Sequence, residues 1–169
     1  MKNLYIDFDG VIMNTIEITY LELKGMNLDY NNMEDQEKIR DYYVSIDWNE
    51  LLNTKASIIN DGMDCIQKLI NSNKFNISIL SHVNSLNEAI EKVNFIRKNF
   101  KDITIIPVPR DISKTEMVHT EGAILVDDYA KNLEEWENAK GIGVKFDKDL
   151  DGKGFKVIDK LDQLLEIEI

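Results

Sequence analysis

The sequence predicts an α/β fold of the Rossmann-like kind, in which a doubly wound parallel sheet carries helices on both faces. Two observations support this prediction: apolar runs of strand length recur along the chain, and amphipathic helical patterns lie between them. The expected strands are residues 4–8, 77–80, 103–108, 123–126 and 142–146. Because strands that alternate with helices pair in parallel, their carboxyl ends should meet along one edge of the sheet.

The helices between these strands are predicted from periodicity. Residues 86–100 carry apolar side chains close to the 3.6-residue period of a helix, at Leu86, Ala89, Ile90, Val93 and Ile96. Asn84 or Ser85 stands where the N-cap of this helix is expected. Residues 63–70 show a similar pattern, and residues 157–169 predict a short closing helix.

One segment interrupts the alternation. Residues 15–60 contain helical patterns rich in Glu, Asn, Tyr and Met, and we find no convincing strand there. We therefore expect a core domain formed by residues 1–14 and 61–169, with residues 15–60 inserted as a small helical cap above the carboxyl ends of the strands. Ligand pockets are often lined by aromatic side chains, so Tyr42, Tyr43 and Trp48 are candidate substrate contacts, although they could instead pack cap helices together.

Composition excludes several classes of function. A net charge of −11 and a pI near 4.6 argue against binding a nucleic acid polymer, which needs clustered Lys and Arg. No apolar run approaches the ~20 residues of a membrane span, and no secretory core follows Lys2, so we expect a cytoplasmic protein without a membrane partner. The single cysteine, Cys65, fits a reducing compartment and is given no chemical role.

Polar residues of catalytic type follow three of the predicted strands. Asp7 and Asp9 leave the first strand together, Ser81 follows the second, and an acidic pair, Asp127 and Asp128, follows a later one. Each could be a polar turn by itself. At the common edge of a parallel sheet, however, they would converge, together with Lys114, and buried carboxylates require a compensating positive charge.

This set suits phosphoryl transfer assisted by Mg²⁺. Mg²⁺ prefers oxygen ligands, which Asp7, Asp128 and the main-chain carbonyl of Asp9 could supply. Asp7 would attack phosphorus as the nucleophile, and Asp9 would protonate the leaving oxygen and later accept a proton from water. The metal would offset the repulsion between the Asp7 carboxylate and an anionic substrate.

Four further residues have expected supporting roles. Ser81 would donate a hydrogen bond to a non-bridging phosphate oxygen, and Lys114 would neutralise developing charge. Asp127 would orient Lys114 or a metal-bound water. His82 is a candidate contact for phosphate or leaving group, with packing or capping of the next helix as the alternative.

In their order along the chain, these residues resemble the signature of the haloacid dehalogenase-like (HAD) hydrolases. The resemblance rests on Asp7-Phe8-Asp9-Gly10-Val11, on Ser81 after an apolar strand, on Lys114, and on Asp127-Asp128. It implies a HAD-type Rossmann-like core, Mg²⁺ as the cofactor, and Asp7 as the nucleophile of a phosphatase or phosphotransferase.

Within this superfamily the sequence is most similar to the 5′(3′)-deoxyribonucleotidase-like branch, through the segment 111–115 and the residues around the acidic pair. It departs from that branch after the second strand, where Ser81, His82 and Val83 replace Thr-Ser-Pro. The resemblance therefore implies a phosphatase for a nucleoside monophosphate or another small phosphorylated metabolite. The alternatives are a phosphatase for sugar phosphates and a non-catalytic protein that binds phosphate esters.

Overall fold

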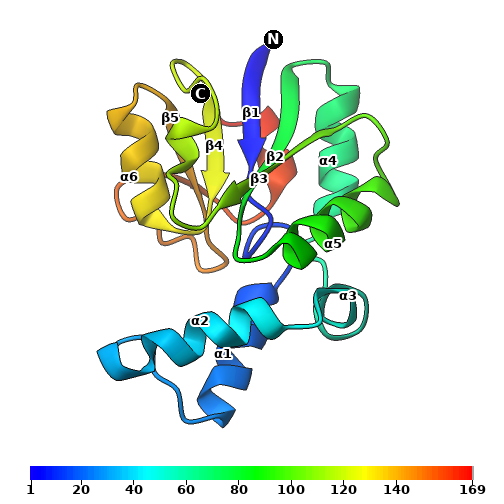
Figure 1. The fold of residues 1–169 in the computed structure, drawn as a ribbon. Coiled ribbons are helices and arrows are strands. Elements are labelled where there is room, and N and C mark those ends of the chain that lie inside the picture. Colours follow the sequence, from blue (N-terminus) through cyan, green and yellow to red (C-terminus); the bar gives the residue numbers. More distant parts are fainter. Residues whose placement is uncertain (169) are drawn as a thin grey trace.

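The computed structural model describes residues 1–168 and forms one parallel sheet of six strands, in the order β3-β2-β1-β4-β5-β6 (Figure 1). The strands are β1 (Lys2–Ile6), β2 (Phe75–Val83), β3 (Thr104–Pro109), β4 (Ile124–Asp127), β5 (Ile142–Phe146) and β6 (Lys156–Ile158). The strand order reverses at β1, which pairs with β2 on one side and β4 on the other. The doubly wound α/β class is therefore confirmed, and β1 lies at the switch point where ligands bind in such sheets.

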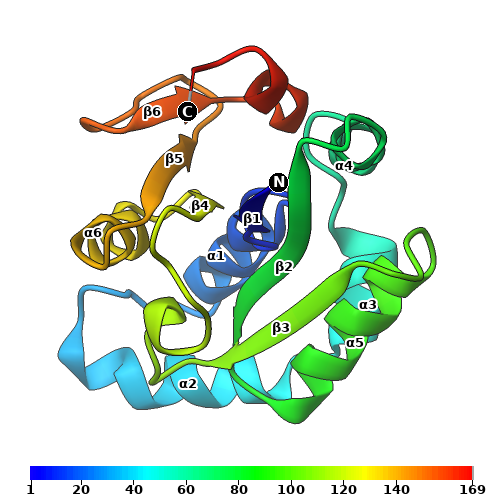
Figure 2. The same cartoon turned by 90° about the horizontal axis from the view of Figure 1, so that it is seen from above.

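Helices cover both faces of the sheet. On one face Leu4 and Ile6 of β1 share a core with Ile66 of α4 (Gly62–Asn71), and on the other Tyr5 packs with Trp136 of α6 (Ala130–Asn138). Figure 1 and Figure 2 show α4 and α6 on opposite sides of the strands. Consecutive side chains of β1 thus enter different core layers, as the alternation along a strand requires.

The C-terminal prediction was wrong in part. Instead of a single helix, the chain forms the edge strand β6 followed by the 3₁₀-helix η4 (Leu161–Leu165); residue 169 lies outside the described residues. Ile158 pairs with Phe146 of β5 and is buried. This pairing buries apolar area that an isolated helical turn would leave exposed.

Helix α5 (Leu86–Arg97) forms where it was predicted, but it buries a different face. Leu86 is 76% exposed and Ile90 is 47% exposed, whereas Glu88 and Lys92 are buried with Ile96. A buried charged pair is stable only when each partner is compensated. The compensating groups belong to the site described below.

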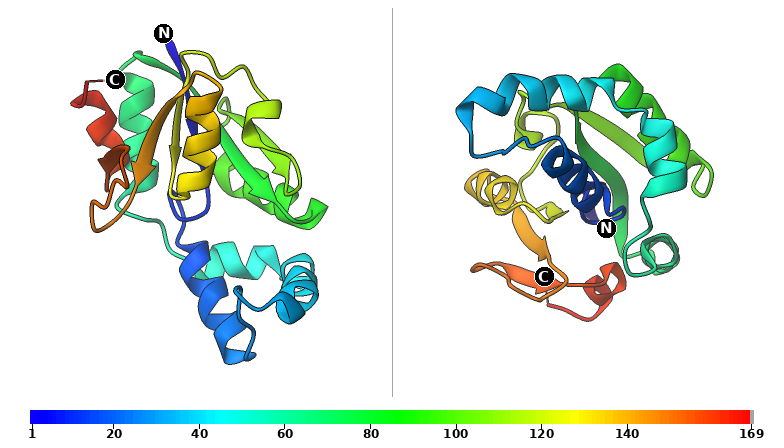
Figure 3. Two further views of the ribbon diagram at one scale, coloured as in Figure 1. Left: turned by 90° about the vertical axis from the view of Figure 1, so that its left-hand side faces the viewer. Right: turned by 90° about the horizontal axis from the view of Figure 1, so that it is seen from below.

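Residues 15–60 form helices, with no strand among them in the part of the chain that is described. They are α1 (Thr15–Gly25), the 3₁₀-helix η1 (Met33–Asp35), α2 (Gln36–Ser45), α3 (Trp48–Glu50) and the π-helix η2 (Leu51–Lys55). Figure 1 and Figure 3 show α1 and α2 beyond the carboxyl ends of the strands. Trp48 and Leu51 belong to the same hydrophobic core as Leu4, so this segment and the sheet are packed together.

The chain leaves and re-enters the core at adjacent points. The Asn14 side chain accepts a 2.6 Å hydrogen bond from the backbone N–H of Ser57, and Met13 bridges to Ile58. This double connection fixes the base of the helical segment next to the loop that carries Asp7 and Asp9. Among residues 1–168, no helix is both long and apolar enough to cross a bilayer.

Candidate active site

The loop that follows β1 holds Asp7 against the neighbouring strand. Its backbone N–H donates a 2.9 Å hydrogen bond to the carbonyl of Val126 in β4. Gly10 then turns the chain with a φ of +73°, and a Cβ built on it would lie only 2.2 Å from Oδ2 of Asp128. Glycine is therefore required here twice, for its left-handed backbone and for the close approach of the Asp128 carboxylate.

Three carboxylates meet at this point. Oxygens of Asp7, Asp127 and Asp128 lie within 4.8 Å of one another, and the predicted convergence of the β1 and β4 ends is present. Asp7 Oδ1 is buried, and its partner is the ammonium of Lys114 at 2.9 Å. Three carboxylates with a single buried cation beside them form the hard oxygen environment that Mg²⁺ prefers, so the residues fit this metal.

Lys114 supplies the positive charge predicted for the site. It opens the 3₁₀-helix η3 (Lys114–Glu116), it is buried, and its Nζ lies 2.6 Å from Asp127 and 2.9 Å from Asp7. Asp127 also accepts hydrogen bonds from the Tyr129 backbone N–H and from the Asn132 amide, both at 2.9 Å. The predicted contact between Asp127 and Lys114 is thus present, and Asp127 is held from three directions.

Burial and mutual repulsion control the charges of these acids. Burial raises the pKa of Asp7 to about 7, although Lys114 opposes the shift, and it raises the pKa of Asp128 to about 8 with help from Asp7. Burial also disfavours the charge on Lys114, but Asp127 and Asp7 outweigh it and keep the pKa of Lys114 above its usual value. Without a metal, Asp7 and Asp128 therefore bind protons more tightly than ordinary aspartates.

These shifts predict a pH-dependent response to Mg²⁺. In the unfolded chain Asp7 and Asp128 lose their protons near 3.8, whereas in the metal-free fold they keep them to about 7 and 8. The folded state binds more protons between these values, so their contribution to stability falls as the pH rises through that window and levels off above it. Mg²⁺ must displace those protons to bind.

Added Mg²⁺ is therefore expected to raise the Tm more at about pH 8 than at about pH 6. Differential scanning calorimetry with and without Mg²⁺ at both pH values measures this difference. Equal Tm increases at the two pH values would contradict the assignment of these carboxylates to a metal site.

Gly10→Ala is expected to weaken Mg²⁺ binding by at least roughly tenfold, because the new methyl group displaces Asp128. The left-handed backbone adds a stability cost of about 1–2 kcal/mol. Gly122→Ala is a matched control: Gly122 has a φ of +70°, but no atom lies within 4 Å of the position that a Cβ would take there. Isothermal titration with Mg²⁺ separates the effects, and equal losses of affinity in both variants would contradict the steric explanation.

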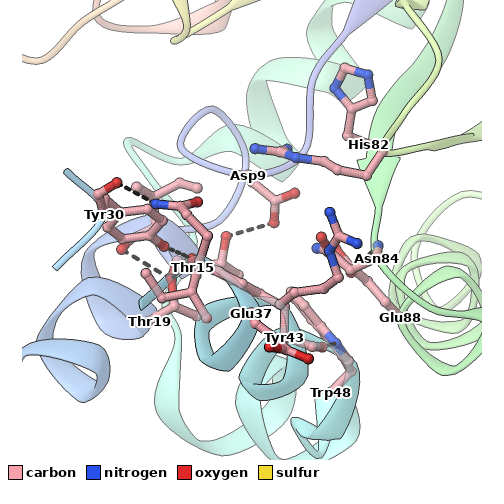
Figure 4. A pocket seen from close by; sticks show the side chains of 15 residues that line it. Asp9, Thr15, Thr19, Tyr30, Glu37, Tyr43, Trp48, His82, Asn84 and Glu88 are labelled. Atoms are coloured by element: carbon pink, nitrogen blue, oxygen red, sulfur yellow. Dashed lines mark hydrogen bonds between the residues drawn. The ribbon is translucent and has the colours of Figure 1, made fainter. Parts of the chain in front are cut away.

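Asp9 faces a second polar cluster. Its Oδ1 accepts a 2.7 Å hydrogen bond from Thr15 at the start of α1 (Figure 4). Its Oδ2 accepts a 3.3 Å hydrogen bond from Ser81. Lys92 of α5 also donates to Oδ2 of Asp9. Ser81 is buried beside these groups, so its hydroxyl contacts Asp9 and Lys92 in this structure, while its predicted contact with phosphate stays a prediction.

Lys92 was missed by sequence reasoning. Its buried ammonium lies 2.7 Å from Glu88, 3.1 Å from the Ser81 hydroxyl and 3.0 Å from the His82 carbonyl. It also lies 5.2 Å from the ring centroid of Trp48, close enough for a cation–π contact. The only sequence signal was the spacing of Glu88 and Lys92 by four residues, which on most helices indicates a solvent-exposed ion pair.

Two cavities adjoin these clusters. One, of about 590 Å³, contains Asp7 and Asp128; the other, of about 660 Å³, extends under the helical segment and is drawn in Figure 4. Asp9 and His82 line both, so the cavities meet at these residues.

The other predicted substrate contacts are distributed unequally around these cavities. Tyr43 and Trp48 line the larger cavity, although Trp48 is only 2% exposed and donates to the Tyr43 carbonyl at 3.4 Å. Tyr42 instead faces α1, where its hydroxyl donates a 2.7 Å hydrogen bond to Glu22, so it joins two helices. His82 lies on β2 with its Nε2 2.9 Å from the Ile112 carbonyl, and burial lowers its pKa.

Comparison with solved structures identifies the fold. A hydrolase from Pseudomonas syringae superposes with a TM-score of 0.63 at 14% identity, covering 98% of this chain and 97% of that one. A HAD-superfamily hydrolase of subfamily IA from Geobacter sulfurreducens gives 0.62 at 15% identity, covering 98% of both chains. This chain has the fold of the HAD hydrolases.

A third solved structure has the same fold. The HAD-hydrolase YfnB from Bacillus subtilis, bound to magnesium, superposes with a TM-score of 0.64 at 12% identity, covering 98% of this chain and 97% of that one. No family model matches the sequence. A search of curated proteins also finds no match. The HAD fold is thus recognised here from tertiary structure, at identities too low to carry an activity across.

Proposed function

We propose that this chain is a Mg²⁺-dependent phosphatase that hydrolyses a small phosphomonoester through an aspartyl-phosphate on Asp7. The observation that carries the proposal is the convergence of the Asp7, Asp127 and Asp128 carboxylates, whose oxygens lie within 4.8 Å of one another beside Lys114. A HAD fold with the acidic residues at its switch point supports the same chemistry.

In the first step Asp7 attacks phosphorus, a bond forms between its carboxylate oxygen and phosphorus, and the bond to the leaving oxygen breaks. Asp9, two residues along the same loop, gives its proton to that oxygen. In the second step water attacks phosphorus, Asp9 accepts the proton, and the Asp7 carboxylate leaves as inorganic phosphate forms. Lys114, 2.9 Å from Asp7, balances the negative charge that accumulates.

Asp7, Asp128 and the main-chain carbonyl of Asp9 would hold Mg²⁺ in this site. When bound, the metal supplies positive charge that polarises the phosphoryl group and offsets its repulsion from Asp7. Asp127 keeps its position in this arrangement through Lys114, Tyr129 and Asn132.

The substrates included in the proposal are nucleoside monophosphates, as for a 5′(3′)-deoxyribonucleotidase, and other small phosphorylated metabolites such as sugar phosphates. Tyr43 on the wall of the larger cavity supports a substrate with a planar group. Trp48 offers little ring surface because it is buried beside Lys92, so base stacking on Trp48 is not part of the proposal.

A phosphate-release screen tests the proposal. The purified chain is incubated with nucleoside monophosphates, sugar phosphates and an aryl phosphate, each with Mg²⁺ and with a chelator. We expect release with Mg²⁺ and its loss with chelator. Activity that survives chelation would contradict the metal assignment, and stoichiometric binding of a phosphate ester without release would favour the non-catalytic alternative.

A further inference from the structure

The chain contains three arginines, and two of them line the larger cavity. Arg97, the third, donates to the carbonyls of Phe100 and Ile103 and so has a structural role. Arg40 of α2 and Arg110, which follows β3, make no ion pair or hydrogen bond with any residue in the described range 1–168. Both residues are exposed, so their guanidinium groups are accessible to a ligand in the cavity.

The two arginines that line the cavity belong to different parts of the fold. Arg40 belongs to the helical segment, whereas Arg110 belongs to the core and lines both cavities. Burial and the bond to Tyr43 raise the pKa of Tyr30, while Arg110 lowers it; burial lowers the pKa of His82, and Arg110 lowers it further. The charge of Arg110 therefore acts on both the helical segment and the core.

The carboxylates on the same wall do not form ion pairs with these two arginines in the described range 1–168. Asp9 and Glu88 also line the cavity, but both are paired with Lys92. Glu37 lies on the same helix as Arg40 without forming an ion pair with it in the described structure. Arginine is suited to binding carboxylate and phosphate groups through its planar fork of N–H donors.

We infer that Arg40 and Arg110 bind a second anionic group of the substrate, so that the preferred substrate is a phosphomonoester carrying an additional phosphate or carboxylate. This inference rests on the proposed function, because it assumes that the phosphate to be hydrolysed sits at Asp7 in the adjoining cavity. The cavity of about 660 Å³ has room for the part of such a molecule that joins its two anionic groups.

Two pairs of substrates test the inference and separate the two sources of negative charge. The carboxylate pair is 3-phosphoglycerate and glycerol 3-phosphate. The phosphate pair is fructose 1,6-bisphosphate and fructose 6-phosphate, with release of the first phosphate measured. We expect kcat/KM to be at least roughly tenfold higher for the member with the second anion in one pair, and that pair identifies the group.

Arg40→Gln and Arg110→Gln are each expected to lower this ratio of kcat/KM values by roughly 10- to 100-fold, since each removes charge-assisted hydrogen bonds to the second anion. Arg40→Lys should restore part of the ratio by returning the charge. Lys38→Gln is the matched control, because Lys38 is an exposed residue of the same helix and does not line the cavity; its ratio should equal that of the parent.

Binding to Asp7→Asn provides a readout that needs no turnover. Calorimetric titration with 3-phosphoglycerate and fructose 1,6-bisphosphate should show affinity that Arg40→Gln weakens by at least roughly tenfold. Phosphate release without a preference in either pair would overturn the inference and leave the phosphatase proposal standing. If no substrate released phosphate, the phosphatase proposal would fail, and an affinity that did not depend on Arg40 would then overturn the inference as well.

Discussion

Asp7→Asn is expected to lower phosphate release by at least roughly 10³-fold, because the amide cannot serve as the attacking nucleophile. The substitution keeps the shape of a side chain that is buried beside Lys114. Since burial already disfavours the Asp7 charge, the variant should fold, and its metal-free form should be at least as stable as the parent at about pH 8.

Steady-state phosphate release and a thermal melt measure the two effects together. Asp64→Asn is the matched control, an aspartate on α4 and remote from the acidic cluster in sequence. It should retain parental activity. Near-parental turnover by Asp7→Asn would mean that water attacks phosphorus directly and that the aspartyl-phosphate mechanism is wrong.

Lys92→Met is expected to cost about 3–5 kcal/mol of unfolding free energy, the loss typical of removing one partner from a buried ion pair. Methionine replaces the apolar stem of Lys92 but leaves Glu88 and Asp9 without a counter-charge. Three side chains contact the Asp9 carboxylate, and the substitution removes one of them, Lys92, while Thr15 and Ser81 remain. Denaturant unfolding gives the free energy, and phosphate release gives kcat and KM.

A double variant separates folding from positioning. Adding Glu88→Gln to Lys92→Met removes the buried negative charge while Asn84 can still donate to the new side chain, so much of the stability should return. The value of kcat should remain roughly 10- to 100-fold below that of the parent, because Asp9 still lacks its contact with Lys92. Lys101→Met, at an exposed lysine, controls for loss of charge. If the double variant recovered kcat together with stability, the role of Lys92 in positioning Asp9 would be contradicted.

The strands could be predicted because each is a compact apolar run bounded by polar residues. The predicted run 142–146 coincides with β5, and the others lie within a few residues of β1 to β4. Strand β6 was not predicted, since three residues carry too little periodicity to distinguish a strand from a helical turn. Its formation depends on the free edge of β5, which exists only once the sheet has assembled.

Helix α5 shows where periodicity fails. Counting apolar residues favoured the face with Leu86 and Ile90, which the structure exposes. The opposite face is buried because Glu88 and Lys92 neutralise each other and because Lys92 meets Asp9 from the loop after β1, 83 residues away in sequence. No local pattern reports a partner at that distance.

The Asp7–Gly10 loop illustrates both levels of information. The sequence by itself determined the α/β class, the order of the acidic residues and Lys114, and their expected meeting at the strand ends, because strand pairing in parallel brings those ends together. Only the tertiary structure decided that Lys92 holds Asp9, that Tyr42 faces α1, and that Arg40 and Arg110 share a cavity. These contacts join different elements of the fold, so they arise from tertiary packing rather than from any local preference of the residues.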